Sequence, residues 1–262
     1  MKKQLLISEK LAPFLTKPQP IKVAFGGRNS GKSIGFGDML IAKMESERCD
    51  VLCLREFQDS VSDSVHRVLK GSIERLGLEG WDIQENRVRS PHGNVSRYLG
   101  AARNPDSIQS AEGYKYSWFE EAHRASQTSL DKLLPTILRR KGSQCWFSAN
   151  PQSSSDPFYK RFVTPFKAAI DRHGFYEDDL HYIVKINYRD NPWYDSAAEQ
   201  LRQHDLATMS RSKYEWIWEG ETYDSVDGAI ITREVFDACI DAHVKLGFKP
   251  EGMEVVSHDP SD

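Results

Sequence analysis

Apolar positions in the first 150 residues follow two periodicities. Short runs rich in β-branched and aromatic residues are typical of strands, and longer stretches with apolar residues three or four positions apart are typical of helices. The strand-like runs are Ile21–Phe25, Val51–Arg55, Tyr116–Phe119 and Cys145–Ser148. Helical spacing is found in Ser33–Arg48 and Ser60–Leu76. Strands that alternate with helices predict an α/β fold, in which a mainly parallel sheet is flanked by helices.

Other predicted elements lie within this alternating region or follow it. From Trp81 to Leu99 the apolar period shortens, and the polar run Pro91–Asn94 interrupts it, which predicts a hairpin with its turn in solvent. The polar stretch His173–Asp179 predicts a loop. The remaining predicted elements are a strand and the two helices of a small helical appendage: His181–Tyr188, Ala197–Leu206 and Arg211–Ile217.

Composition and charge are those of an ordinary soluble globular protein. The 262 residues are 39% hydrophobic and 28% charged, and 35 Lys+Arg against 38 Asp+Glu give a formal net charge of -3. No apolar run is long enough for a membrane span or a signal peptide, so we expect a cytoplasmic protein with no membrane partner. The net charge argues against a passive nucleic-acid coat, although it leaves room for a local basic face.

The cysteines do not predict a disulfide-stabilised fold. The four cysteines are too few for a network of disulfides. Cys49 and Cys53 lack the second pair of ligands that a zinc site requires, so we expect them to be buried thiols.

The strongest motif follows the first predicted strand and opens the first predicted helix. Gly26, Gly27, Arg28, Asn29, Ser30, Gly31, Lys32 and Ser33 match G-x-x-x-x-G-K-[ST] in full. In such a loop, backbone N–H groups close around phosphate oxygens, Lys32 reaches the β and γ phosphates, and the Ser33 hydroxyl ligates Mg²⁺. The predicted ligands are therefore a nucleoside triphosphate and Mg²⁺. Because the chain lacks the guanine-reading motif N-K-x-D, the favoured nucleotide is ATP.

Two adjacent carboxylates follow the third predicted strand. We expect Glu120 to take the metal-side role, which Asp usually fills, and Glu121 to act as the catalytic base that positions the attacking water. Two acids after an apolar run can also mark an exposed helix N-terminus, where the helix dipole favours negative charge. Their place downstream of a complete P-loop favours the catalytic interpretation.

The last predicted strand of this region ends in polar residues. Ser148 and Asn150 bring a hydroxyl and an amide to the edge of the sheet where the γ-phosphate is expected, so they are candidates for sensing it. A polar turn that simply ends the strand is the alternative. Phe14 and Gln19 in the N-terminal segment are candidates for contacting the adenine.

Taken together, these motifs resemble those of one family, the large terminase subunit, which is the ATP-driven DNA-packaging motor of tailed bacteriophages. The resemblance runs nearly end to end and rests on the order of its motifs, since a P-loop alone is common to many ATPases. The matching segments are Lys22–Ser33, Leu52–Val65, Trp118–Ala122, Phe147–Pro151, Asn187–Pro192, Ile217–Glu221 and His258–Asp262.

The resemblance implies roles for individual residues and a division into domains. Arg28 matches an arginine that the family places in its P-loop, where the guanidinium stabilises the γ-phosphate. Ser148, Ala149 and Asn150 match the coupling motif that links hydrolysis to movement. The implied domains are a P-loop ATPase domain over residues 1–188, a linker subdomain over 189–250, and the start of a truncated RNase H-like nuclease domain over 251–262.

The resemblance also implies partners. These are double-stranded DNA, the portal protein and the small terminase subunit, with a homo-oligomeric ring on the portal and a monomer in isolation, in the cytoplasm of the bacterial host cell. Asp259 falls where the first nuclease acid belongs, but one acid cannot hold two metal ions, so we expect nuclease activity only in a longer chain. An arginine from a neighbouring subunit is expected at the ATP as well.

DNA contacts are the least determined feature of the sequence. Cations gather at Arg139–Lys141, at Lys160–Arg161 and on the appendage, and each group is more typical of a solvated face than of a DNA site. Two alternative functions stay open. A helicase-like ATPase that remodels nucleic acid should respond to single strands, and an assembly module that binds ATP without hydrolysing it should tolerate Glu121→Gln.

Overall fold

The computed structural model describes residues 5–57, 61–102, 113–223, 238–240 and 242–247. The chain divides into two units, residues 1–223 and 224–262. The second unit contributes one described helix, α10 (Ala242–Lys245). Asp259 lies outside the described residues. None of the helices within the described ranges is long and apolar enough to cross a membrane.

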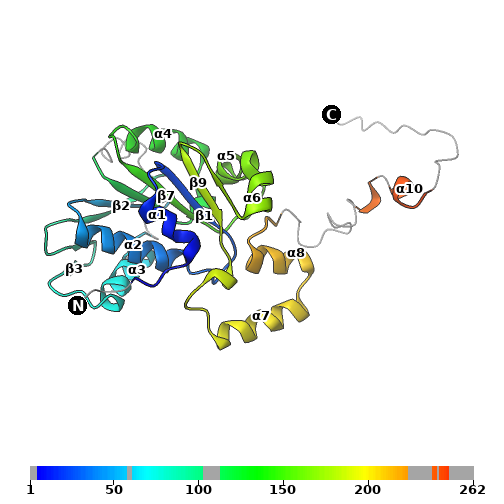
Figure 1. The fold of residues 1–262 in the computed structure, drawn as a ribbon, viewed down its shortest axis with the longest axis horizontal. Coiled ribbons are helices and arrows are strands. Elements are labelled where there is room, and N and C mark those ends of the chain that lie inside the picture. Colours follow the sequence, from blue (N-terminus) through cyan, green and yellow to red (C-terminus); the bar gives the residue numbers. More distant parts are fainter. Residues whose placement is uncertain (1–4, 58–60, 103–112, 224–237, 241, 248–262) are drawn as a thin grey trace. The chain divides into compact units, whose positions relative to one another are not determined.

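A seven-stranded sheet forms the centre of the first unit (Figure 1), with the strand order β5-β2-β6-β7-β1-β9-β8. Its strands are β1 (Ile21–Phe25), β2 (Val51–Arg55), β5 (Ser96–Gly100), β6 (Tyr116–Phe119), β7 (Gln144–Ala149), β8 (Phe175–Glu177) and β9 (His181–Lys185). Every pair is parallel except β8 with β9. The predicted α/β fold with a mainly parallel sheet is therefore confirmed.

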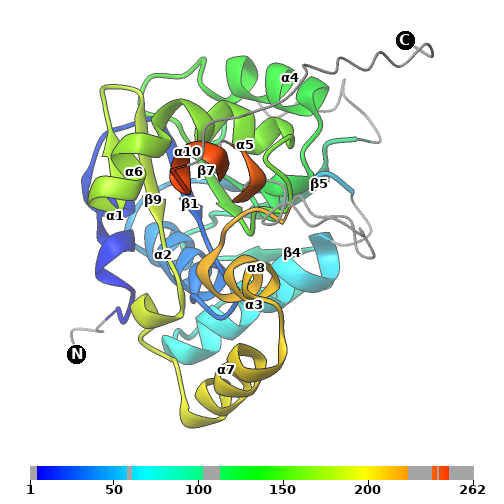
Figure 2. The same ribbon diagram turned by 90° about the vertical axis from the view of Figure 1, so that its right-hand side faces the viewer.

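Helices cover both faces of this sheet (Figures 1 and 2). The α-helices of the first unit are α1 (Ala12–Thr16), α2 (Lys32–Ser46), α3 (Val61–Arg75), α4 (Gln127–Ile137), α5 (Pro157–Phe162), α6 (Lys167–His173), α7 (Ser196–Thr208) and α8 (Arg211–Tyr214). Short 3-10 helices cover Glu9–Leu11, Ala122–Arg124, Thr164–Phe166 and Tyr188–Asp190. One core lies between the sheet and α4 to α6, and a second lies between the sheet and α1 to α3.

The two cores explain why the inner strands are mostly apolar and buried on both faces. On β7, Phe147 belongs to the first core and Trp146 to the second, because successive side chains of a strand point to opposite faces. All five residues of β1 are buried. Strands that are covered on both sides have no solvent face, so they read as continuous apolar runs.

Two sequence predictions in this region are wrong. The segment Trp81–Leu99 is not one hairpin: β3 (Asp82–Gln84) and β4 (Arg87–Arg89) form a small antiparallel pair, and β5 then joins the main sheet parallel to β2. The expected loop His173–Asp179 contains β8, which pairs with β9. Both errors concern strands that lie at an edge of the sheet or in a two-stranded ribbon.

The predicted helical appendage consists of α7, α8 and a π-helix over Glu215–Glu219. The side chain of Asp195 accepts a hydrogen bond from the backbone N–H of Ala198 and so caps α7. A separate small core of Tyr188, Tyr214 and Trp218 holds the segment together.

Candidate active site

The P-loop has the strand–loop–helix context that its motif demands. β1 ends at Phe25, and α2 begins at Lys32. Between them Asn29 and Gly31 adopt left-handed backbone conformations, with φ of 58° and 74°. A side chain at Gly31 would be strained and would also approach Asn191, since an added Cβ would lie 2.7 Å from the Asn191 side-chain oxygen.

Lys32 is buried inside this loop. Its ammonium donates hydrogen bonds to the carbonyl oxygen of Gly27 at 2.8 Å and to the Ser30 hydroxyl at 2.6 Å. Burial lowers the pKa of Lys32 to about 7, because the charged form is poorly solvated there. A bound phosphate would supply the negative charge that this lysine lacks among its present partners.

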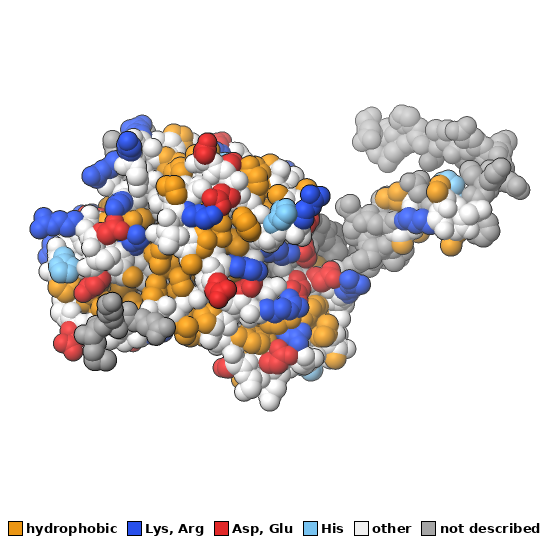
Figure 3. All heavy atoms as spheres, in the orientation of Figure 1, with side chains coloured by type: hydrophobic (Ala, Val, Ile, Leu, Met, Phe, Trp, Pro, Cys, Tyr) orange, Lys and Arg blue, Asp and Glu red, His pale blue; other side chains and the backbone are white. Residues whose placement is uncertain are grey.

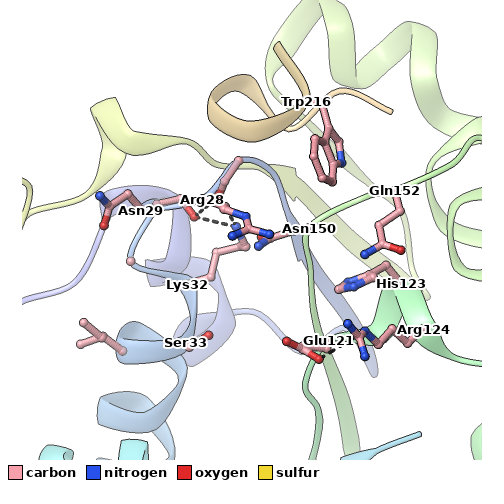
Figure 4. A pocket seen from close by; sticks show the side chains of 14 residues that line it. Arg28, Asn29, Lys32, Ser33, Glu121, His123, Arg124, Asn150, Gln152 and Trp216 are labelled. Carbon is pink, nitrogen blue, oxygen red and sulfur yellow. Dashed lines mark hydrogen bonds and ion pairs between the residues drawn. The ribbon is translucent and has the colours of Figure 1, made fainter. Parts of the chain in front are cut away.

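A cavity of about 420 Å³ opens over the P-loop (Figure 4). One wall is the loop itself, from Gly27 to Ile34. The facing walls come from residues after β6, residues after β7 and the π-helix: Glu121, His123, Arg124, Asn150, Gln152 and Trp216. Because β6, β7 and β1 are neighbours and run parallel, their carboxyl ends meet at one edge of the sheet and bring these side chains together.

The two predicted carboxylates occupy different positions. Glu120 is buried just behind the cavity and accepts a hydrogen bond from Nε of Arg55. Burial raises the pKa of Glu120, while the bonds from Arg55 and Ser33 oppose that rise. Glu120 and Ser33 therefore lie side by side, as two oxygen ligands of one metal ion must.

Glu121 lines the cavity itself. Its carboxylate lies 3.4 Å from Nη2 of Arg55 and 3.6 Å from Nε of Arg124, and Figure 4 shows it facing Ser33 across the cavity. Its backbone is left-handed, with φ of 52° and ψ of 43°. For a residue with a long side chain this conformation costs about 1 kcal/mol or more, so the surrounding fold holds Glu121 in a strained position that aims its carboxylate.

The predicted sensor residues are separated by the structure. Asn150 lines the cavity. The Ser148 hydroxyl does not: it is buried and accepts a hydrogen bond from Nε1 of Trp118 on β6 at 2.9 Å. Ala149 is buried in the first core. Of the three, only Asn150 is therefore placed to meet a phosphate directly, and Ser148 ties β7 to β6 below it.

Several cavity residues were not predicted from sequence. His123 is 8% exposed, and its Nδ1 has no hydrogen-bond partner within the described part of the chain. Trp216 donates a hydrogen bond from Nε1 to the carbonyl oxygen of Pro151. The only sequence feature that marks His123 is its place two residues after Glu121, while the contact of Trp216 depends on a distant segment.

The candidates for adenine contact lie elsewhere. Phe14 is buried among Phe36, Trp146 and Tyr182 in the second core. Gln19 donates hydrogen bonds to Glu177 and to a neighbouring carbonyl of the β8–β9 connection. Neither side chain lines the cavity over the P-loop. Cys49 and Cys53 are buried free thiols, as expected.

The outer side of the P-loop is covered by the helical appendage. The backbone N–H of Arg28 donates to the carbonyl oxygen of Ile217 at 2.6 Å. The Asn191 side chain donates to the carbonyl oxygen of Asn29 at 2.8 Å. At Gly27 an added Cβ would lie 2.1 Å from the carbonyl oxygen of Trp218, so only glycine permits this approach.

Comparisons with known proteins identify the family and the fold of the chain. The family model described as phage terminase large subunit matches residues 18–221. No curated protein matches the chain. Among solved structures, the large terminase of a thermophilic bacteriophage superposes with a TM-score of 0.63 at 14% identity, over 82% of this chain and 53% of that one. This chain thus spans about half the length of that terminase, which has also been solved in complex with ADP.

Two isolated ATPase domains are matched over nearly their whole length. The large terminase ATPase domain of Thermus phage P74-26 has a TM-score of 0.56 at 14% identity, over 84% of this chain and 94% of that one. The N-terminal domain of the DNA packaging ATPase of bacteriophage phi29 has a TM-score of 0.53 at 14% identity, over 67% of this chain and 94% of that one. At such identities the likeness concerns the fold, whereas the family follows from the sequence match over residues 18–221: the chain belongs to the phage terminase large subunit family.

Proposed function

We propose that this chain is the ATPase motor part of a phage large terminase, which hydrolyses ATP to translocate double-stranded DNA into a procapsid. The observation that carries the proposal is the meeting of Lys32, Ser33 and Glu121 at one cavity, in a chain of the terminase family. The P-loop supplies phosphate binding, and Glu121 supplies the general base that turnover requires.

The residues present fit ATP and Mg²⁺. The cavity wall from Gly27 to Ser33 offers backbone N–H groups, the Lys32 ammonium and the start of α2, all of which attract phosphate. Ser33 and Glu120 would hold Mg²⁺, which neutralises charge on the phosphate oxygens when bound. Among the described residues no group of three or more His, Cys, Asp and Glu side chains lies together, so the remaining metal ligands would be phosphate oxygens and water.

Each cavity residue then has a distinct task. Glu121 would orient the attacking water and accept its proton. Arg28, which is exposed in the P-loop, would contact the γ-phosphate with its guanidinium. Asn150 would hydrogen-bond the γ-phosphate when ATP is bound and would lose this bond when ADP is bound. Through Ala149 and Ser148, which precede it at the end of β7, the change in nucleotide state would reach the sheet.

The wider assembly is also part of the proposal. We place the ATPase domain at residues 1–188, the linker subdomain at 189–250 and the start of a nuclease domain at 251–262. The partners would be double-stranded DNA, the portal protein, the small terminase subunit and further copies of the chain in a ring, in the cytoplasm of the host cell. Asp259 would be the first nuclease acid of a longer chain.

Steady-state ATP hydrolysis tests the proposal. Wild type is compared with Lys32→Ala, Glu121→Gln and the control Glu74→Gln, which removes an exposed carboxylate on α3 that pairs at 4.0 Å with Lys70. We expect Lys32→Ala and Glu121→Gln to lower kcat at least about a hundredfold, with Glu121→Gln still binding ATP, and Glu74→Gln to match wild type. Assays use Mg²⁺ with duplex DNA or single strands.

The outcomes separate the functions that the sequence left open. Stimulation by duplex DNA supports a packaging motor. Stimulation by single strands alone would instead indicate a helicase-like enzyme. Nucleotide binding without turnover, even with portal and small subunit present, would contradict an ATPase motor and indicate an assembly module.

A further inference from the structure

A basic groove lies at the amino ends of the parallel strands, at the opposite edge of the sheet from the P-loop. Its volume is about 470 Å³, and its cationic lining residues are Arg48, Lys115, Arg140 and Lys141. They come from the segments just before β2, β6 and β7, whose amino ends lie side by side because these strands are parallel. Arg48, Arg140 and Lys141 are exposed, and Lys115 pairs with Glu47.

A second basic groove adjoins the first. Its volume is about 630 Å³, and Arg87, Arg89 and Arg97 line it, with no carboxylate among the described residues of its lining. Arg87 and Arg89 belong to β4, and Arg97 lies on the edge strand β5. Asn94 lines the first groove and Val95 the second, so consecutive residues form the wall between them.

Side-chain hydrogen bonds fix the wall between the two grooves. The Asn94 side chain donates to the carbonyl oxygens of Met44 and Glu47 at 2.6 and 2.7 Å and accepts from the backbone N–H of Cys49 at 3.1 Å. Within the described part of the chain, Asp50 is the only carboxylate that lines either groove, and its Oδ1 accepts the backbone N–H of Val95 at 2.7 Å. These hydrogen bonds fix the wall between the two grooves to the segment that joins α2 and β2.

We infer that these seven cations, which we call the basic belt, bind the phosphate backbone of duplex DNA. A chain with a formal net charge of -3 gathers seven cations in these adjoining grooves, against Asp50 in the lining and Glu47, which pairs with Lys115. On the face drawn in Figure 3, blue side chains gather toward the end of the first unit that carries β3. Arginine in particular suits phosphate, because its planar guanidinium binds two oxygens at once.

The lining favours a duplex over a single strand. Sites for single strands combine cations with aromatic faces on which bases stack. Tyr98 is the one aromatic side chain among the described residues that line the two grooves. Its ring packs edge-on against His66, while its hydroxyl is hydrogen-bonded to the His66 ring at 2.9 Å. A surface of this kind reads the backbone and no bases, as a translocating motor requires. The inference rests on the proposed function for its choice of DNA as the polyanion.

Binding of a short labelled duplex, measured by fluorescence anisotropy at several salt concentrations, tests the inference. The variants are Arg140→Ala with Lys141→Ala, and Arg89→Ala with Arg97→Ala. The control is Lys160→Ala with Arg172→Ala, which removes two exposed cations on α5 and α6 outside both grooves. We expect each belt pair to weaken binding about tenfold and to lower the slope of log K against log salt by about 2, with the control near wild type.

The inference is overturned if the control weakens binding as much as the belt pairs, if the belt pairs bind like wild type, or if a single strand of the same length binds as tightly as the duplex. ATP hydrolysis without DNA separates this result from the proposed function, since the belt lies away from the nucleotide cavity. Belt variants that lose duplex binding while wild type shows no turnover would support the belt and contradict the motor. Turnover by a wild type that binds no duplex would overturn the basic belt and would leave only the ATP hydrolysis of the proposed function supported.

Discussion

Lys22 shows how a charged residue is accommodated inside the sheet. It is the second residue of β1, is fully buried, and donates hydrogen bonds to the carbonyl oxygens of Phe14 and Lys17 at 2.7 and 2.6 Å. These carbonyls belong to the end of α1, where no intrahelical donor remains for them. The lysine therefore closes the C-terminus of α1 against the sheet, in a strand that periodicity alone marks as apolar.

The stability of the protein should depend on the protonation of Lys22. Burial, helped by the charge of Lys43, lowers the pKa of Lys22 from 10.5 to about 7 in the folded state. Between these values the unfolded chain binds a proton that the folded chain does not, so the free energy of unfolding should rise with pH, by up to about 1 kcal/mol per pH unit. Urea unfolding at pH 7 and pH 9 measures this rise.

The matched variant is Lys22→Met, which keeps an unbranched side chain one atom shorter and removes the titrating group. Its free energy of unfolding should rise less between the two pH values than that of wild type. An equal rise in both proteins would show that other groups dominate.

His123 should contribute to turnover. Burial lowers the pKa of His123 to about 4, so its ring is neutral at physiological pH and presents a buried nitrogen to the cavity. We expect His123→Ala to lower kcat by about tenfold to a hundredfold with a smaller change in KM for ATP, because a water or phosphate oxygen loses its partner. The pH profile above pH 6 should keep its shape. A kcat equal to that of wild type would assign the histidine to packing alone.

Individual site residues could be predicted where a motif fixes their spacing. Gly26 to Ser33 are consecutive in the sequence and run from the P-loop into the start of α2, so their motif predicts their position. Glu121 comes just after β6 and could be predicted from that strand. The sequence suggested that the Ser148 hydroxyl would face the phosphate, whereas in the structure it is buried and accepts a hydrogen bond from Trp118. No local sequence pattern reveals this contact. The cavity role of Trp216 depends on how a distant segment folds back onto the P-loop.

At the scale of elements, the P-loop and the π-helix fit each other through their backbones. The π-helix ends at Gly220, whose φ of 72° is left-handed. An added Cβ there would lie 2.3 Å from the Cα of Gly26. The loop that binds phosphate is thus shaped from outside by a segment nearly 200 residues further along the chain.

Gly220→Ala should therefore disturb nucleotide binding. The change adds backbone strain of about 1 kcal/mol and a backbone clash that no side-chain rotation relieves. Gly174→Ala is the control, because Gly174 has a similar φ of 79° but open space around its Cβ position. We expect Gly174→Ala to lower stability by the strain alone, and Gly220→Ala to weaken ATP binding in isothermal titration as well. Equal ATP affinity in the two variants would contradict this coupling.

Buried elements were the easiest to predict. The expected bounds of β1, β2 and β6 coincide with the observed ones, since a strand covered on both faces is a mostly apolar run with a clear start and end. β5 and β8 lie at the two edges of the sheet and are each only partly buried. The strands with which β5 and β8 pair depend on the arrangement of the whole sheet, and hydrophobic periodicity along the chain carries no information about that arrangement.

At the scale of the whole molecule, the nucleotide cavity joins β1, β6, β7 and the π-helix, so ligand binding should stabilise the first unit as one body. ATP with Mg²⁺ at about one hundred times its dissociation constant adds about 2.7 kcal/mol. For a unit of this size we expect Tm to rise by about 5 to 10 °C in calorimetry. Lys32→Ala should show little shift, and a full shift in that variant would place the nucleotide elsewhere.

The backbone contacts between Gly220, Gly26 and Gly27 also bear on protein engineering. Consider a chimera that joins the sheet of this chain to the helical appendage of a relative at 14% identity. The P-loop and the appendage would then come from different proteins, and their surfaces would not fit each other. Because the contact is between backbones, no flexible side chain could adjust to the mismatch. The junction of a functional hybrid therefore belongs after Tyr223, where the first unit ends, and not at the end of the sheet.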